Sequence, residues 1–181
     1  MKKFLTILLA LTMLLSLAAC GGDPAENRPD AAPDGTEEPG EAVGETVDLQ
    51  ALYDDFMVWM AEEYGEENVP QTDELDAEVL DMFYPGLSGM NCKQLVTRSS
   101  AISAVAFEMV LAEMENEEDA KAAAEIFQNN MDYQVEEGAW YPATVEAWEN
   151  GQVIRNGSYV ALLVAGEAQA QAVEAFQALF A

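Results

Sequence analysis

The sequence predicts an α+β domain: a four-stranded, mainly antiparallel sheet made of two hairpins, with helices packed on one face and further N-terminal helices before it. Apolar side chains alternate with a period of two within residues 94–113 and again within residues 152–164, which is typical of strands. Apolar residues recur at helical spacing after each hairpin and before the first one, which indicates helices.

The first predicted helix covers residues 47–65, where Asp48 can cap the N-terminus and Gly65 marks the end. A shorter helix is predicted over residues 73–83, and Tyr84-Pro85-Gly86 ends it because proline does not continue a helix. The apolar stripe of the first helix consists of Leu49, Leu52, Tyr53, Phe56, Trp59, Met60 and Tyr64.

The first hairpin is predicted from strands at residues 94–99 and 105–113, joined by a turn at residues 99–103. Its second strand has two distinct faces. One face carries Val105, Phe107, Met109 and Leu111, and the other carries Ala104, Ala106, Glu108, Val110 and Ala112.

A helix is predicted over residues 117–137. Asn116 is a suitable N-cap, and the three acidic residues that follow favour the positive end of the helix dipole. Gly138 and Pro142 end this helix, and a short helical or turn segment follows to Asn150. The predicted core stripe consists of Ala120, Ala123, Ala124, Phe127, Met131 and Val135.

The second hairpin is predicted over residues 152–164, with Asn156-Gly157 as the centre of a type I′ turn, in which both central residues have positive φ. A last helix is predicted over residues 167–180, and we expect it to close the core. Its inward residues are Ala172, Val173, Phe176, Leu179 and Phe180.

The N-terminal 19 residues have the features of a bacterial lipoprotein signal peptide. Lys2 and Lys3 precede a 14-residue apolar run, Phe4–Leu17, which is shorter than the ~20 residues of a membrane span. The run closes on Leu17-Ala18-Ala19-Cys20, a sequence typical of lipoprotein processing. We expect cleavage before Cys20, a diacylglyceryl group on its thiol, and a protein anchored to the outer, extracytoplasmic face of the cell membrane.

Lipidated Cys20 is followed by a predicted linker. Residues 21–46 contain five glycines, four prolines and eight acidic residues, a composition that favours disorder. The predicted organisation is a signal peptide at residues 1–19, the lipidated cysteine and acidic linker at residues 20–46, and a single domain at residues 47–181.

The predicted domain is strongly acidic. Residues 47–181 contain 26 aspartates and glutamates against four lysines and arginines, a formal charge of −22. This charge argues against nucleic acid and anionic lipid headgroups as partners, because it repels phosphates. A solvated acidic surface is favoured over an attraction to cations or to a basic partner.

The chain has no histidine, which removes the usual base of Ser–His–Asp and Cys–His sites. Cys92 is the only cysteine left after lipidation, and a small half-buried side chain is its favoured interpretation. We therefore expect no enzyme, no catalytic residue and no cofactor. A small envelope hydrolase that uses two carboxylates stays a lesser alternative.

Two groups of carboxylates raise the question of calcium. Neither has the spacing of a known calcium loop, so solvated helix ends are favoured and no metal site is predicted. The two groups are Glu62, Glu63, Glu66 and Glu67, and Glu115, Glu117, Glu118 and Asp119.

Three residues are candidates for binding. Glu108 lies on a strand face of small apolar residues, so either Arg98 or Lys93 pairs with it or that face is open to solvent or ligand. Trp140 and Tyr141 fall in a predicted loop, where exposed rings would stack on cell-wall sugars. Packing of these two rings against the sheet is the favoured alternative.

Short motifs over residues 75–180 resemble a family of lipid-anchored, mostly Gram-positive bacterial proteins that is classed only as a domain of unknown function. The resemblance implies a small extracytoplasmic α+β domain and brings no catalytic residues. Its motifs are the lipoprotein start, Tyr84-Pro85-Gly86, Ala106-Phe107-Glu108-Met109, Glu117-Glu118-Asp119-Ala120, Tyr141-Pro142 and Asn156-Gly157-Ser158-Tyr159-Val160.

Together these features predict a membrane-anchored, non-catalytic domain that binds an envelope protein or a small ligand. A cell-wall carbohydrate-binding module is the alternative.

Overall fold

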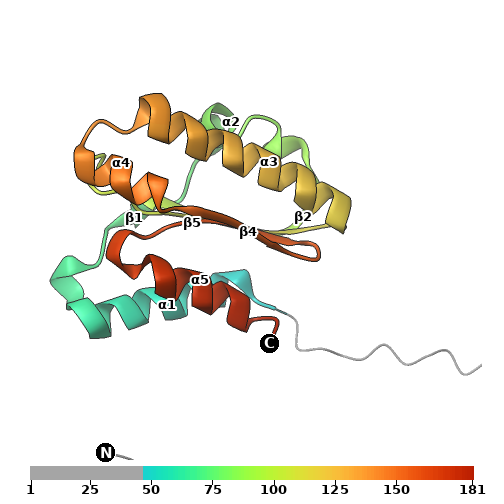
Figure 1. Cartoon of the computed structure of the whole chain (residues 1–181). Helices are drawn as coiled ribbons and strands as arrows, with labels where there is room; N and C mark the ends of the chain where they lie inside the picture. The colour runs from blue at the N-terminus through green and yellow to red at the C-terminus, as the bar shows by residue number, and fades with distance from the viewer. Residues whose placement is uncertain (1–46) are drawn as a thin grey trace, which may run out of the picture. The chain divides into compact units, whose positions relative to one another are not determined.

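A computed structural model describes residues 47–181, so Cys20, the signal sequence Leu17-Ala18-Ala19-Cys20 and the linker lie outside the described residues. Figure 1 shows a central sheet with helices on both sides. The elements are α1 (Leu49–Tyr64), η1 (Glu66–Asn68), β1 (Thr72–Asp73), α2 (Ala77–Phe83), η2 (Leu87–Gly89), β2 (Cys92–Ser100), β3 (Glu108–Met114), α3 (Glu117–Tyr133), η3 (Gln134–Gly138), α4 (Pro142–Glu149), β4 (Gln152–Asn156), β5 (Tyr159–Val164), η4 (Gly166–Ala168) and α5 (Gln169–Ala178).

The sheet confirms the α+β class and both predicted hairpins. Its strand order is β1-β2-β3-β5-β4, and every neighbouring pair is antiparallel. The predicted number of four strands is wrong, because β1 adds a fifth at the edge. Two residues form β1, Thr72 opposite Ser100 and Asp73 opposite Ser99, and a strand of that length is too short to show a period-two pattern.

Helices cover both faces of the sheet, so the prediction of helices on one face is wrong. We call the face covered by α1 and α5 the first face, and the face covered by α2, α3 and α4 the second face (Figure 1). The physical reason lies in the central strands β3 and β5, where both sets of alternating side chains are buried. Strands of this kind need a layer on each side to exclude water.

The position at which the chain leaves each hairpin selects the face of the next helix. Met114 ends β3 among the second-face residues, and α3 follows on that face. After β5, the next residue, Ala165, packs among the first-face residues, and α5 follows there. A shift of one residue in the position where the strand ends is enough to change the face, because successive side chains along a strand point to opposite faces.

Several predicted boundaries are close to the observed ones. The side chain of Asp48 caps α1, and that of Asn116 accepts hydrogen bonds from the first turn of α3. The predicted helix over residues 73–83 starts later, because Asp76 caps it. In the second hairpin Asn156 pairs with Tyr159, so the two-residue turn consists of Gly157 and Ser158 rather than Asn156 and Gly157.

Candidate functional site

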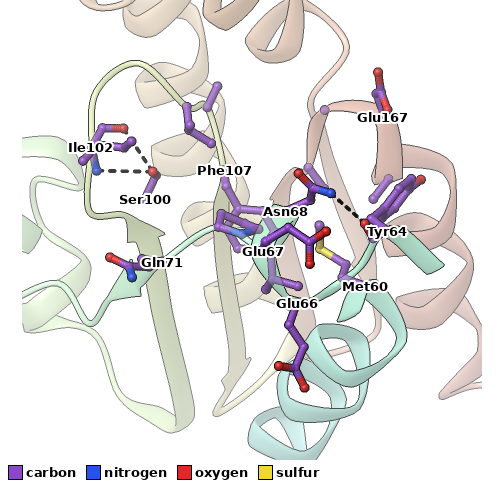
Figure 2. A pocket seen from close by; sticks show the side chains of 17 residues that line it. Met60, Tyr64, Glu66, Glu67, Asn68, Gln71, Ser100, Ile102, Phe107 and Glu167 are labelled. Carbon is purple, nitrogen blue, oxygen red and sulfur yellow. Dashed lines mark hydrogen bonds between the residues drawn. The ribbon is translucent and has the colours of Figure 1, made fainter. Parts of the chain in front are cut away.

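Two cavities lie at the same end of the sheet, one on each side of the loop between β2 and β3. Both are lined by residues of this loop, including Ile102, Val105 and Phe107. The cavity on the first face has a volume of about 810 Å³. Figure 2 shows the carboxylates of Glu66 and Glu167 at its edge, directed away from Phe107. Its acidic groups therefore do not converge on one point.

The cavity on the second face has a volume of about 750 Å³ and contains all three sequence-predicted binding residues: Glu108, Trp140 and Tyr141. We call it the Glu108 cavity. Residues from α2, β2, β3, η3 and α4 line it, so segments far apart in the sequence meet here. Besides those three, the lining includes Leu75, Val79, Phe83, Ser99, Phe107, Gln134, Ala139, Thr144 and Trp148.

Glu108 is buried, with 7% of its surface exposed, and two hydroxyl groups bind its carboxylate. The hydroxyl of Tyr84 donates a hydrogen bond to Oε1, and the hydroxyl of Ser99 donates one to Oε2 at 3.0 Å. Ser99 is the residue directly opposite Glu108 in the ladder between β2 and β3. Tyr84, the residue after α2, is completely buried.

The predicted partners of Glu108, Arg98 and Lys93, are wrong. Arg98 lies opposite Met109 in the ladder, so its side chain is on the first face, where its guanidinium lies 5.4 Å from the ring centre of Tyr53. It pairs with Glu74 at 3.2 Å, and Lys93 pairs with Glu113 at 3.7 Å. Arg98 therefore lies on the opposite side of the sheet from Glu108, and both cations pair with other carboxylates.

Burial raises the pKa of Glu108, and the hydrogen bonds from Tyr84 and Ser99 act in the opposite direction. Burial also raises the pKa of Tyr84 well above its ordinary value, and the nearby charge of Glu108 adds to this. Tyr84 therefore stays protonated at neutral pH and remains a donor. A carboxylate held by two donors in an apolar setting is a feature common at functional sites.

Two amides extend this polar group along the second face. Nε2 of Gln134, which lines the cavity, donates to Oδ1 of buried Asn130 at 3.5 Å. Asn130 lowers the pKa of the Tyr84 phenol against the larger raising effect of burial, and Nδ2 of Asn130 has no hydrogen-bond partner among the described residues. Such unsatisfied buried donors are rare in folded proteins.

Trp140 and Tyr141 lie at the cavity mouth, 87% and 53% exposed, so the favoured prediction that they pack against the sheet is wrong. The hydroxyl of Thr144 donates to the carbonyl of Tyr141 at 2.9 Å, which holds this segment at the start of α4. Ile102 and Val105 are also exposed on the same cavity. The mouth is therefore surrounded by apolar groups that contact water.

The other two tryptophans, Trp59 and Trp148, and Cys92 have structural environments. Trp59 stacks on Phe56 in the first-face core, and Trp148 is buried in the second-face core. Sγ of Cys92 lies 3.5 Å from the sulfur of Met114, and burial raises the pKa of the thiol, which disfavours the nucleophilic thiolate.

Neither carboxylate group considered for calcium forms a metal site in the structure. Across residues 47–181, no three aspartate, glutamate or cysteine side chains converge closely enough to hold a metal ion. The same residues include no helix that is long and apolar enough to cross a membrane.

Sequence reasoning missed Tyr84, Ser99, Asn130 and Gln134. Tyr84 belongs to the predicted helix-ending turn and to a motif of the resemblance, and Ser99 lies where the predicted strand 94–99 meets its turn; neither pattern assigns them to a site. The one available signal for Ser99 was strand pairing: a hairpin register with a longer loop, residues 101–107, places it opposite Glu108. No local pattern in the sequence relates Tyr84 or Asn130 to Glu108, because both come from other elements.

Comparisons with protein-family models, with curated protein sequences and with solved structures find no match to this chain. The resemblance to a family of lipid-anchored proteins therefore stays a prediction, and the functional argument depends on the site itself.

Proposed function

We propose that this chain is a membrane-anchored extracytoplasmic lipoprotein whose domain, residues 47–181, binds a ligand in the Glu108 cavity and does not act as an enzyme. The observation that carries the binding role is the convergence of a buried, hydrogen-bonded carboxylate with two exposed aromatic rings on one cavity of about 750 Å³. Ligand sites are typically cavities of ~300–1,000 Å³ with apolar walls and a few placed polar groups.

The binding role is tested by NMR with small organic probes. We expect isopropanol, phenol and acetonitrile to shift the resonances of the Trp140 indole and of the Glu108 and Ala106 amides, which belong to the cavity lining. Phe176, buried on the first face, provides the internal control and should not respond. An absence of probe-dependent shifts around the cavity contradicts the binding role.

The anchoring is tested separately through Cys20, the proposed site of the diacylglyceryl group. The wild-type protein should partition with the membrane fraction, and Cys20→Ala should release it, since two acyl chains give stable anchoring. If Cys20→Ala still partitions with membranes, lipid anchoring is wrong. This result leaves the cavity proposal untouched, because Cys20 lies outside the domain.

A cell-wall carbohydrate-binding role is the second candidate, favoured by the exposure of Trp140 and Tyr141. Neighbouring exposed aromatic rings offer flat apolar surfaces to sugars. Retention of the domain on purified peptidoglycan, lost in Trp140→Ala, supports this candidate. Passage of the wild-type domain through the same column without delay argues against it.

A further inference from the structure

Glu108 has no cationic partner in the described part of the chain. The two ion pairs within residues 47–181 are Lys93–Glu113 and Arg98–Glu74, and neither involves Glu108. A buried carboxylate is ordinarily paired with a cation or coordinates one, because burying an unpaired charge is costly. We therefore look for a cationic partner of Glu108 among ligands rather than among residues 47–181.

The carboxylate also has acceptor capacity to spare. Its two oxygens offer about four lone-pair sites in total. Tyr84 and Ser99 use two of them, one on each oxygen. Glu108 also lines the cavity, and the two remaining sites can accept contacts from a ligand there without displacement of either hydroxyl group.

Aromatic rings surround the same space. Phe83, Trp140, Tyr141 and Trp148 all line the Glu108 cavity. The faces of aromatic rings attract cations, with tryptophan the strongest, and the attraction rises to about 2 kcal/mol when the cation is desolvated. A buried anion within aromatic walls favours a cation that also carries apolar surface.

The charge of the whole domain favours the same class of ligand. Residues 47–181 carry a formal charge of −22, which raises the local concentration of cations and lowers that of anions. A neutral sugar gains nothing from this long-range field, although its hydroxyl groups donate hydrogen bonds to carboxylates.

We infer that the Glu108 cavity binds an organic ammonium ion, with the positive nitrogen facing the Glu108 carboxylate and the alkyl groups against the aromatic walls. This inference rests on the proposed function, since it names the class of ligand for the same cavity. The bound cation completes the carboxylate's environment, and Tyr84 and Ser99 position the carboxylate through their hydrogen bonds.

Calorimetry with three small molecules tests the inference. Choline is compared with 3,3-dimethyl-1-butanol, its neutral isostere, and with n-butylammonium, which reproduces the end of a lysine side chain. We expect choline or n-butylammonium to bind at least ten-fold more tightly than the neutral isostere. A preference for choline indicates a small quaternary ligand, and a preference for n-butylammonium indicates the lysine of a protein partner; both support the inference.

Two matched variants assign the effect to the carboxylate. Glu108→Gln keeps the size of the side chain and should abolish the preference for the cation. Glu167→Gln makes the same change at an exposed residue of the other cavity and should leave the preference unchanged. If Glu108→Gln does not fold, as judged by circular dichroism, Trp140→Ala serves instead and should weaken the binding of choline about two- to five-fold.

The possible failures are distinguishable. Equal binding of choline, n-butylammonium and the neutral isostere overturns the ammonium inference but keeps the cavity as a ligand site. If no ammonium ion binds while the organic NMR probes do, the inference is likewise overturned and the proposed function stands. If neither the probes nor the ammonium ions bind, both are wrong.

Discussion

The two faces of the sheet differ in what they bury. The first face packs α1 and α5 over an apolar core that includes Met109, Leu111 and Phe176, and no buried polar side chain of residues 47–181 lines its cavity. The second face buries Glu108, Asn130 and Thr144 and leaves a cavity next to them. Thr97, a fourth buried polar residue, lies opposite Val110 and so belongs to the second face as well.

The one buried polar residue among the helices of the first face serves the backbone. Gln169 accepts a hydrogen bond from the amide of Ala165 and donates one to the carbonyl of Leu163, so it ties α5 to the end of β5. On the second face Glu108 and Asn130 form hydrogen bonds with other side chains, whereas Thr97 and Thr144 form theirs with the backbone. Strand β3 contributes to both faces. Because its side chains alternate, one set packs in the first-face core and the other set reaches the site on the second face.

The largest expected effect tests the packing face. Phe176, fully buried on α5, contributes only apolar contacts, so Phe176→Ala should lower the free energy of unfolding by about 3–5 kcal/mol. Urea denaturation measures this change. At a temperature where the variant is folded, its affinity for choline should equal that of the wild-type protein. A loss of affinity in the folded variant would show that the two faces are not separate.

The next effect compares the same substitution on both faces. Tyr84→Phe leaves Oε1 of buried Glu108 without its donor, which should cost about 1–3 kcal/mol of stability. Tyr53→Phe on the first face removes a hydrogen bond at 2.6 Å to the hydroxyl of Thr72, a neutral partner, and should cost about 1 kcal/mol or less. Urea midpoints at unchanged m-values measure both. Equal costs would contradict a special role for the Glu108 carboxylate.

A pH series isolates the charge on Glu108. Because burial raises the pKa of Glu108 above its ordinary value of 4.5, the folded protein holds this proton more tightly than the unfolded chain. Its contribution to stability is present below about pH 4.5 and is lost as the pH rises through the folded-state pKa. The facing side chains do not titrate in this window: Tyr84 has a pKa well above its ordinary value, and Ser99, Asn130 and Thr144 are neutral.

Glu108→Gln removes this dependence, since glutamine does not ionise. We expect the melting temperature of Glu108→Gln relative to wild type to increase as the pH rises above 4.5 and to level off above the folded-state pKa of Glu108. Each unit of raised pKa corresponds to about 1.4 kcal/mol. Calorimetric melting of both proteins across the series provides the measurement, and a constant difference at every pH would show that Glu108 titrates as an exposed glutamate does.

Local patterns predicted much of the fold. The caps at Asp48 and Asn116 were readable because capping depends on residues two or three positions away. The alternation in β3 and the position of the second hairpin were readable for the same reason. The two-sided burial was not recognised, although the unbroken apolar run Val160–Val164 is what a strand covered on both faces shows.

The site was predictable only in part. Glu108 was singled out because a charged residue interrupts an apolar strand face, and this signal is local. Its partners depend on register: a shift of one residue decides whether Arg98 or Ser99 faces Glu108. Tyr84 reaches it only through the packing of α2 on the second face. That Trp140 lies beside the same cavity is likewise a consequence of tertiary packing, which no single segment encodes.

The smallest effect on stability concerns Trp140, which the structure leaves 87% exposed. Trp140→Ala should change the free energy of unfolding by less than about 0.5 kcal/mol, because few protein contacts are lost. Val58→Ala, a truncation of an exposed apolar residue on α1 that does not line the Glu108 cavity, is the control for both stability and ligand affinity. A loss of more than 1 kcal/mol in Trp140→Ala would mean that the ring packs onto the domain in solution. The cavity would then be partly closed by its own tryptophan, and the contrast between the two faces would weaken.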